Sequence, residues 1–335
     1  SELVAGDGSL TAIAQMVLPV LARPERIISV SAVTVGQTAI DSAVILAPHD
    51  GGPFVLRGDR DEHVDLVVLD SPTAAVSLLD QMMMITGLPT TSAAADVQLD
   101  RIAWVGLLAA TDAERVARLE SQLARNTDSA PTFDAARLDH LIDQALGADD
   151  SRWILGAEAL VDRASVETGA GAGQAALSGL ITAGLAEFTA SDTAALNDTG
   201  RVWAEMLSTF VRLSHVRMLH VVDGDPVDVG GMAFFRSPTD VVVAQIGSTD
   251  VRIMSLHADV AAATLRAAVE GATESGVDAP ATRTGQADPS SSGESAGEWI
   301  YVLDPVEVRG LYDTSAIAGM LEPGNWYLRG SEQGG

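Results

Sequence analysis

An internal repeat constrains the fold of this chain more than any single motif does. Residues 9–33 and 198–222 match at a constant offset of 189 positions, which places Leu18 on Leu207. In each copy, apolar residues recur at helical spacing, and an apolar strand pattern follows at once. Segments that share one packing arrangement keep the same order of helix and strand even when few of their residues are identical. The match therefore indicates two copies of one folding unit.

The repeat continues past the first strand of each copy. Residues 40–70 and 229–257 each have the pattern of three short strands joined by Gly, Asp and Pro turns, with the offset shortened to 187. Each copy then ends in an amphipathic pattern, at 72–85 and 258–270. The sequence thus predicts an α+β fold of two quasi-repeated halves, each a helix, a four-stranded antiparallel meander and a second helix.

Individual residues mark the ends of these helices. Ser9 and Asp198 are good N-cap residues for the first helix of each copy. In the last helix of each copy, Leu78 falls on Leu265 at the shortened offset. The first strands are expected at 27–33 and 216–222.

The rest of the chain divides by composition. Between the copies the pattern is helical. Residues 271–297 are rich in Ser, Gly, Ala and Asp, so we expect a disordered linker there. The tail beyond it carries all three tyrosines, and we expect it to dock on the second repeat. The expected units are a first repeat at 1–91, a helical region at 92–190, a second repeat at 191–270, the linker at 271–297 and the tail at 298–335.

Two signals predict helix starts inside the helical region. Asp100 is placed to cap a helix through the following apolar residues. Thr111 and Glu114 have the spacing of a capping box, which predicts that a second helix opens there and runs to about Arg125.

Composition excludes several classes of chemistry. The chain has no cysteine and no lysine, which removes thiol nucleophiles, cysteine-ligated metal sites and a lysine Schiff base. The 46 acidic and 20 basic residues give a formal charge of −26, which disfavours nucleic acid and anionic membranes as ligands. No apolar run reaches the length of about 20 residues that a spanning helix needs. We therefore expect a soluble, acidic, cytoplasmic protein that does not insert into membranes.

The glycine-rich stretch at 167–177, ETGAGAGQAAL, resembles a phosphate-binding loop at first sight. A dinucleotide fingerprint needs a strand that leads directly into its glycines. Here the preceding residues, ILGAEALVDRASV, have a helical pattern instead. The glycines are interpreted as a break between helices, and no cofactor is expected.

Catalytic patterns are sparse. The six histidines include no HExxH pair, so a metal site would have to be assembled by the fold. His215, His220 and His257 are the candidates, at the rim of the second meander, although strand-end and turn histidines are the more frequent reading. No GxSxG elbow is present. We therefore predict no catalytic residues and no metal ligands.

Binding features are better represented than catalytic ones. Met82 and Met83 lie in a run of three thioethers, which suits adaptable surfaces, although core filling is the commoner use. Met232, Phe234 and Arg236 share one face of a strand. If that face is open, it marks a partner surface. The predicted partner-binding residues are these five and His220.

The layout resembles that of the EspG family of ESX (type VII) secretion chaperones of actinobacteria. The resemblance rests on LVAGDGSLTAIAQMVLPVLARPERIISVSAV (3–33), HVDLVVLDSPTAAVSLLDQM (63–82) and ADVQLDRI (95–102), and it covers about 3–110 and 150–270. It implies a cytosolic protein of two pseudo-symmetric α+β halves that keeps a PE–PPE heterodimer soluble by binding its helical tip. Family members carry a further N-terminal segment, so this chain is expected to be a truncated or processed form.

The expected function is therefore that of a non-enzymatic binding protein, a type VII secretion chaperone for a PE–PPE-type helical client. One alternative is an immunity or structural adaptor protein on the same scaffold. Another is a hydrolase that uses carboxylates or a histidine-bound metal. A homodimer is compatible with each of these expectations.

Overall fold

The structure is a computed structural model that describes residues 11–48, 52–60, 63–86, 95–124, 131–147, 150–166, 168–169, 171–271 and 327–328. The expected linker and most of the tail lie outside the described residues. The chain is α+β, with one large sheet whose strands are mainly antiparallel. The helices are α1 Ala12–Ala22, α2 Pro72–Met83, α3 Arg101–Ala124, α4 Ala135–Gly147, α5 Ile154–Val161, α6 Arg163–Val166, α7 Ala172–Thr182, α8 Asp198–Ser208 and α9 Ala258–Glu270.

The strands fall into two groups along the chain. The first group is β1 Arg26–Thr34, β2 Ile40–Ala47, β3 Phe54–Arg60, β4 His63–Leu69 and β5 Ala95–Asp100. The second is β6 Ala186–Phe188, β7 Ala194–Leu196, β8 Arg212–Val222, β9 Asp225–Arg236, β10 Val241–Ile246, β11 Asp250–Leu256 and β12 Tyr327–Leu328.

The large sheet joins two meanders through their first strands. Its order is β12-β4-β3-β2-β1-β8-β9-β10-β11-β5, and β6 pairs separately with β7. The contact between the meanders is the antiparallel pair β1–β8, in which Val30 lies opposite Val216. β12 is the exception to the antiparallel pattern, since it pairs in parallel with β4. This pairing puts the described part of the tail on the first meander, whereas docking on the second was expected.

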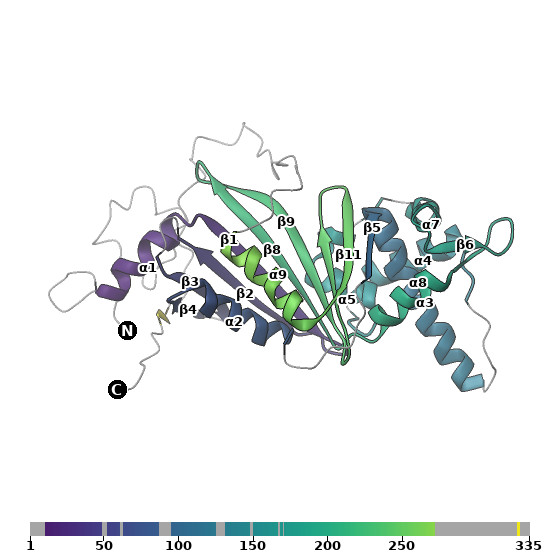
Figure 1. The fold of residues 1–335 in the computed structure, drawn as a ribbon, viewed down its shortest axis with the longest axis horizontal. Coiled ribbons are helices and arrows are strands. Elements are labelled where there is room, and N and C mark those ends of the chain that lie inside the picture. Colours follow the sequence, from purple (N-terminus) through teal and green to yellow (C-terminus); the bar gives the residue numbers. More distant parts are fainter. Residues whose placement is uncertain are drawn as a thin grey trace.

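One face of the large sheet is covered by two helices. α2 and α9 lie next to each other across this face, in front of the strands in Figure 1. Their apolar sides meet inward-facing strand residues such as Ile45, Phe234 and Val243. The buried positions of the two helices are offset by 186, with Leu79 on Leu265, which is one residue from the expected match of Leu78 with Leu265.

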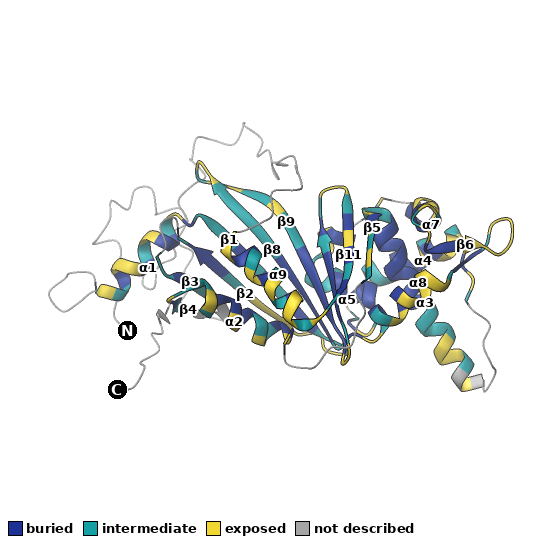
Figure 2. Ribbon diagram, in the orientation of Figure 1, coloured by how far each residue is buried: buried dark blue, intermediate teal, exposed yellow. Residues whose placement is uncertain are grey.

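Among the described residues, helices pack on the opposite face mainly at its two ends. α1 packs on β2, β3 and β4 at one end, through Val17 and Leu21. At the other end, a bundle that includes α3, α4, α5, α7 and α8 packs on β9, β10 and β11 around Trp104 and Phe235. Figure 2 shows the dark-blue core running through this bundle and along the central strands. Between α1 and this bundle lies the middle of the face, where β1 and β8 pair.

Local sequence explains most helix starts. The side chain of Thr11 accepts a hydrogen bond from the N–H of Ala14, so Thr11 caps α1, while Ser9 lies outside the described residues. Ser71 caps α2 in the same way, with proline at the first helical position. Asn197, rather than Asp198, caps α8. Asp100 caps α3 as expected, since its carboxylate accepts from the N–H of Ala103.

The predicted capping box at Thr111 is wrong, because α3 runs through it without a break. The Thr111 hydroxyl donates to the carbonyl of Leu107 within the same helix. The neighbouring Asp112 is buried and caps another helix, because its carboxylate accepts from the backbone N–H groups of Ile154 and Leu155 at the start of α5. A pattern that is typical of a local cap thus serves a contact 42 residues away.

Two further differences concern the extent of strands. β8 and β9 begin earlier than expected and form a long hairpin that extends past the rest of the sheet in Figure 1. β5 adds an edge strand beside β11 within the region that was expected to be helical. The interpretation of the glycine stretch as a break between helices is confirmed, because helix α6 and not a strand precedes it, and Gly171, with a φ of 78°, immediately precedes α7.

Candidate functional site

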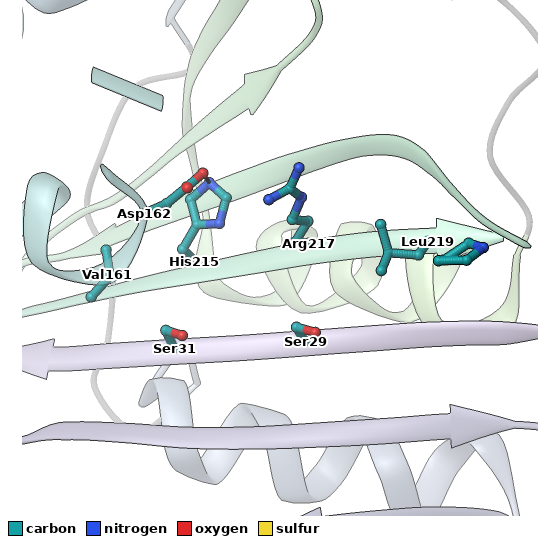
Figure 3. Close-up of a pocket in the computed structure, with 8 residues that line it drawn as sticks. Ser29, Ser31, Val161, Asp162, His215, Arg217 and Leu219 are labelled. Carbon is teal, nitrogen blue, oxygen red and sulfur yellow. Dashed lines mark ion pairs between the residues drawn. The ribbon is translucent and has the colours of Figure 1, made fainter. Parts of the chain in front are cut away.

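A cleft of about 430 Å³ opens on the face of the sheet that α1 and the helical bundle share, between these two. It is formed by β1, the β8–β9 hairpin and the junction of α5 with α6. Figure 3 shows the side chains that line it. They are Ser29, Ser31, Val161, Asp162, His215, Arg217, Leu219 and Pro226.

The position of the cleft follows from the side chains of β1. Alternate residues of a strand point to the same face, and on this face β1 presents Ile27, Ser29, Ser31 and Val33. Ile27 packs under α1 and Val33 packs under the bundle. The two serines lie in the interval between these covers, beside the end of α5, and both are half-buried.

A buried histidine and an aspartate meet at the inner end of the cleft. Helix α5 ends at Val161, and Asp162 leaves helical geometry before α6 begins. This break carries the Asp162 carboxylate to 3.2 Å from Nε2 of His215, which is 4% exposed. Their alignment does not make a hydrogen bond, so the Nε2 atom is buried without one in the described part of the chain. Figure 3 shows the two groups pointing toward each other.

Burial determines the charge of this histidine. Desolvation lowers the pKa of His215 below its ordinary value, and Arg217 acts in the same direction, while the nearby Asp162 and Asp228 oppose the shift. A histidine with a lowered pKa is neutral at pH 7. Asp162 therefore faces an uncharged imidazole rather than a cation.

Two adjacent glycines in β9 shape this end of the cleft, one through its backbone and one through its lack of a side chain. The β8–β9 register shifts between Met218 and Leu219, where Gly230 has a φ of 118° that favours glycine. At Gly231, an added Cβ would approach Cε1 of His215 to 2.9 Å, so a larger residue would displace the imidazole. Sheet bulges often lie beside functional sites, because they redirect side chains.

The bulge also places an ion pair at the open side of the cleft. Asp228 accepts a hydrogen bond from the N–H of Gly230 and pairs with Arg217, whose Nε donates to its carboxylate at 3.0 Å. The pair balances its own charge. With a neutral His215, the Asp162 carboxylate is the one uncompensated charge among the residues that line the cleft.

The cleft also carries hydroxyl groups that are not used within the described structure. Ser31 lies directly opposite His215 in the β1–β8 register, and Ser29 lies opposite Arg217. Neither hydroxyl makes a hydrogen bond to another described residue. The Nε2 atom of His215 faces Asp162, and the described residues contain no hydrogen bond from Ser31 to the ring, so the arrangement suits binding of a polar group better than activation of a serine.

A second candidate surface is the far end of α3. This 24-residue helix is buried from Ala103 to Ala113 and then extends past the helices that cover it, downward at the right of Figure 1. Leu119 and Leu123, one turn apart, are 52% and 85% exposed. Beside them, a small cleft between α3 and α8 is lined by Glu114, Arg115, Arg118, Arg201, Ala204, Glu205 and Ser208.

The structure does not place the predicted partner-binding residues on an open face. Met232, Phe234 and Arg236 are buried beneath α2 and α9, and Met83 is buried in the same cluster. Met82 and His220 are half-buried. The expectation of an uncovered apolar face on β9 is therefore wrong, because the final helix of each half covers that face.

Arg236 has a structural role in this position. Its guanidinium donates to the backbone carbonyls of Met84, Ser237 and Asp240, and so ties the end of α2 to the β9–β10 turn. Burial lowers its pKa, and Asp240 opposes this shift.

The candidate histidines do not gather either. His215 and His220 differ by an odd number of positions on β8 and so point to opposite faces, and His257 precedes α9. No group of three or more His, Cys, Asp or Glu is placed to hold a metal within the described part of the chain. Among these residues, no helix is both long and apolar enough to cross a membrane.

Sequence reasoning missed Asp162, Ser29, Ser31 and the role of the two glycines. The signals were present but weak. The Gly-Gly pair inside an apolar strand is typical of a bulge or of a close approach by another group. The polar pairs Ser29 and Ser31, and His215 and Arg217, each share one face of their strand, and an interruption of apolar alternation marks an uncovered stretch.

No known protein family matches the chain, and no curated protein matches it in sequence. Among solved structures, it is similar to the Mycobacterium tuberculosis type VII secretion system chaperone EspG5, in a complex with a PE25–PPE41 dimer. The likeness has 10% identity and a TM-score of 0.38, and it covers 80% of this chain and 79% of EspG5. Values this low do not establish that the two proteins share a fold or a function.

Proposed function

We propose that this chain is a non-catalytic binding protein that holds a helical protein client, in the manner of a secretion chaperone. The observation that carries the proposal is the apolar stripe of Leu119 and Leu123 on the projecting end of α3. Leucines four residues apart on a helix lie on the same side of it. A stripe of this kind is how one helix receives the apolar side of another.

The energy available from this stripe suits reversible binding. Full burial of a leucine side chain contributes about 1.5–3 kcal/mol, and both side chains are at least half exposed. Two such contacts at the centre of an interface supply a large share of a micromolar affinity, which is about 8 kcal/mol. Entropy lost on association reduces this gain, so the leucines act as anchors among further contacts.

The charges near the stripe are of both signs. Arg118 and Arg201 are exposed beside it, while Glu114 and Glu205 line the same small cleft and Glu120 is exposed next to Leu119. A client helix can therefore pair with either sign at this place. The proposed client is an amphipathic helix or helical hairpin whose apolar stripe has charges of both signs along its edge.

We take this client to be of the PE–PPE type, as the resemblance noted in the sequence implies. A PE–PPE-type heterodimer presents a helical tip, and binding at α3 would cover it before export from the cytoplasm. The strongly acidic surface would then keep the complex soluble through charge repulsion between molecules.

The experiment is co-expression of the chain with a PE–PPE pair, followed by co-purification and measurement of affinity. The double variant Leu119→Ser, Leu123→Ser is expected to weaken binding roughly tenfold to a hundredfold. Both side chains are exposed, so the free energy of unfolding should change by less than about 0.5 kcal/mol per site. Val260→Ser on α9 is a matched control, since Val260 is 45% exposed and lies on another surface.

Two results would contradict the proposal. One is a client that stays insoluble whether or not the chain is present. The other is a monomer–dimer equilibrium in this chain alone that the double leucine variant abolishes, because the stripe would then serve self-association. Light scattering after gel filtration measures that equilibrium.

We also propose that the scaffold arose by duplication of one unit. The order helix, four strands, helix occurs at α1 to α2 and again at α8 to α9. In the final helices, Ala75, Leu79 and Met83 are buried at the positions of Ala261, Leu265 and Val269, at a constant offset of 186. Each half places its last helix on the same face, and the cleft lies where the first strands of the halves meet.

A further inference from the structure

The geometry points to the cleft at the β1–β8 junction as a binding site for a cationic group, an alkylammonium or a guanidinium, held by the Asp162 carboxylate and the hydroxyls of Ser29 and Ser31. This site is separate from the α3 stripe. The stripe would hold apolar side chains, whereas the cleft selects a positive charge.

Charge decides the sign of the ligand. Arg217 and Asp228 neutralise each other across the bulge, and the buried His215 is neutral at pH 7 because its pKa is lowered by desolvation. The Asp162 carboxylate then remains without a cation. Its side chain is 18% exposed and faces the cleft, so a ligand can reach it. The field of a chain with a formal charge of −26 acts in the same direction.

The lining provides hydrogen-bond acceptors for such a ligand. The hydroxyls of Ser29 and Ser31 make no hydrogen bond to other described residues, and a hydroxyl oxygen accepts from N–H donors. Both side chains lie on the strand that borders the cleft, next to the strand that carries His215. Three acceptor groups around one opening suit the three donors of an ammonium or the fork of a guanidinium.

The volume and the apolar lining suit a ligand with an aliphatic stem. About 430 Å³ lies within the range of small-molecule sites and exceeds what a bare ammonium ion needs. Val161, Leu219 and Pro226 supply apolar lining. Lysine, arginine and simple alkylamines bury their methylene stem against such surfaces while the charged end reaches a polar partner.

The cleft is also built into the fold. Gly231 leaves space for the His215 ring, and Gly230 adopts a backbone conformation that side chains disfavour. His215 is 4% exposed, and its Nε2 atom is buried without a hydrogen bond in the described chain. Because Nε2 lies 3.2 Å from the Asp162 carboxylate, the His215 ring lies next to any cation that this carboxylate binds.

Nuclear magnetic resonance of the His215 ring tests the site directly. The protein is labelled at histidine, and the His215 signal is assigned from its loss in His215→Gln. The labelled protein is then titrated with n-butylammonium and with n-butylguanidinium at constant ionic strength. We expect a saturable shift of the His215 signal with a dissociation constant on the order of millimolar, as befits one small cation.

Variants separate the site from a general effect of charge. Asp162→Asn is expected to weaken the titration roughly tenfold or more, because the ionic partner is lost. Asp192→Asn, in the exposed turn between β6 and β7, keeps the same net charge as that variant and should titrate like the unchanged protein. Ser29→Ala with Ser31→Ala retains every charge and is expected to weaken binding roughly threefold to tenfold.

Three outcomes would overturn the proposal. One is a shift that grows linearly without saturation. A second is equal titration of the unchanged protein and Asp162→Asn. A third is saturation by butyrate at lower concentration than by butylammonium, because it makes the cleft an anion site. The serine variant keeps the test decisive if Asp162→Asn fails to fold.

The source of the cation rests on the proposed function. In a client complex, the ligand is a lysine or arginine side chain of the client, so Asp162→Asn should weaken the complex roughly tenfold while the α3 stripe is intact. An undiminished complex would assign the site to free amines instead. Saturable binding of butylammonium without any client complex would refute the chaperone role and leave the cation site standing.

Discussion

Replacing Glu158 with glutamine removes one ionisable group from the interior while keeping its shape. Glu158 lies in α5 and is fully buried. One carboxyl oxygen accepts a hydrogen bond from the Ser165 hydroxyl at 2.9 Å, and the other has no partner in the described part of the chain. Burial raises the pKa of Glu158 from 4.5 to about 8, the nearby Asp162 charge adds to the rise, and the Ser165 hydrogen bond opposes it.

The sign of the resulting pH dependence follows from proton counting. Between about pH 4.5 and pH 8 the folded chain keeps a proton on Glu158 that the unfolded chain has released. The free energy of unfolding therefore falls as pH rises through this window, by about 1.4 kcal/mol per pH unit. Across the whole window the loss amounts to about 5 kcal/mol, which is a large part of the stability of a typical domain.

Glutamine carries no such proton, so Glu158→Gln should lose this slope. Near pH 5 the variant and the unchanged protein are expected to have similar stability. Near pH 8 the variant should be more stable by about 3–5 kcal/mol. Burial raises the pKa of Asp112 from 3.8 to about 6. The free energy of unfolding of both proteins therefore falls further as pH rises from about 3.8 to about 6, and this contribution cancels in the comparison.

Urea unfolding followed by circular dichroism at several pH values between about 5 and 8 measures the effect. Glu187→Gln is the control, because Glu187 is exposed on β6 and its replacement should leave the slope unchanged. Parallel stability curves for the unchanged protein and Glu158→Gln would refute the reasoning. They would mean that Glu158 is ionised in the folded state and reached by water.

Two further substitutions test contacts inside the bundle. Gly173→Ala should destabilise the chain by about 3 kcal/mol or more, because the new Cβ would clash with the carbonyl oxygen of Ala135 and force α4 and α7 apart; a loss below about 1 kcal/mol in urea unfolding would show that the helices can shift freely. Asp112→Ala removes both hydrogen bonds at the start of α5 and should cost about 1–2 kcal/mol, whereas Asp112→Asn keeps an acceptor and should cost less; equal losses in thermal unfolding would argue against a capping role.

The candidate site shows where prediction from sequence stops. The cleft combines Asp162 from a helix break with His215 and Ser31 from two strands that are far apart in the chain. Each of these residues is unremarkable in its own segment, since a lone aspartate, histidine or serine is a common surface residue. Their proximity depends on β1 pairing with β8, a contact that no local pattern encodes.

The predicted partner surface failed for a related reason. Alternation along β9 correctly placed Met232, Phe234 and Arg236 on one face of the strand. It did not say which layer would lie over that face, and α2 and α9 bury it. Strand periodicity separates two faces, but helices from elsewhere in the chain decide which of them reaches solvent.

By itself, the sequence predicted most of the elements and their order, but not β5, β6 and β7, because helical and strand spacing, capping side chains and turn residues act within a few positions. It thus specified two runs of helix, four strands and helix, as well as the break at the glycine stretch. The tertiary structure alone decided how these elements meet: the single sheet joined at β1–β8, the reuse of Asp112 as a cap for α5, and the half-buried interval at Ser29 and Ser31. These features depend on contacts across more than 40 residues, where burial and the hydrogen bonding of buried polar groups outweigh local preference.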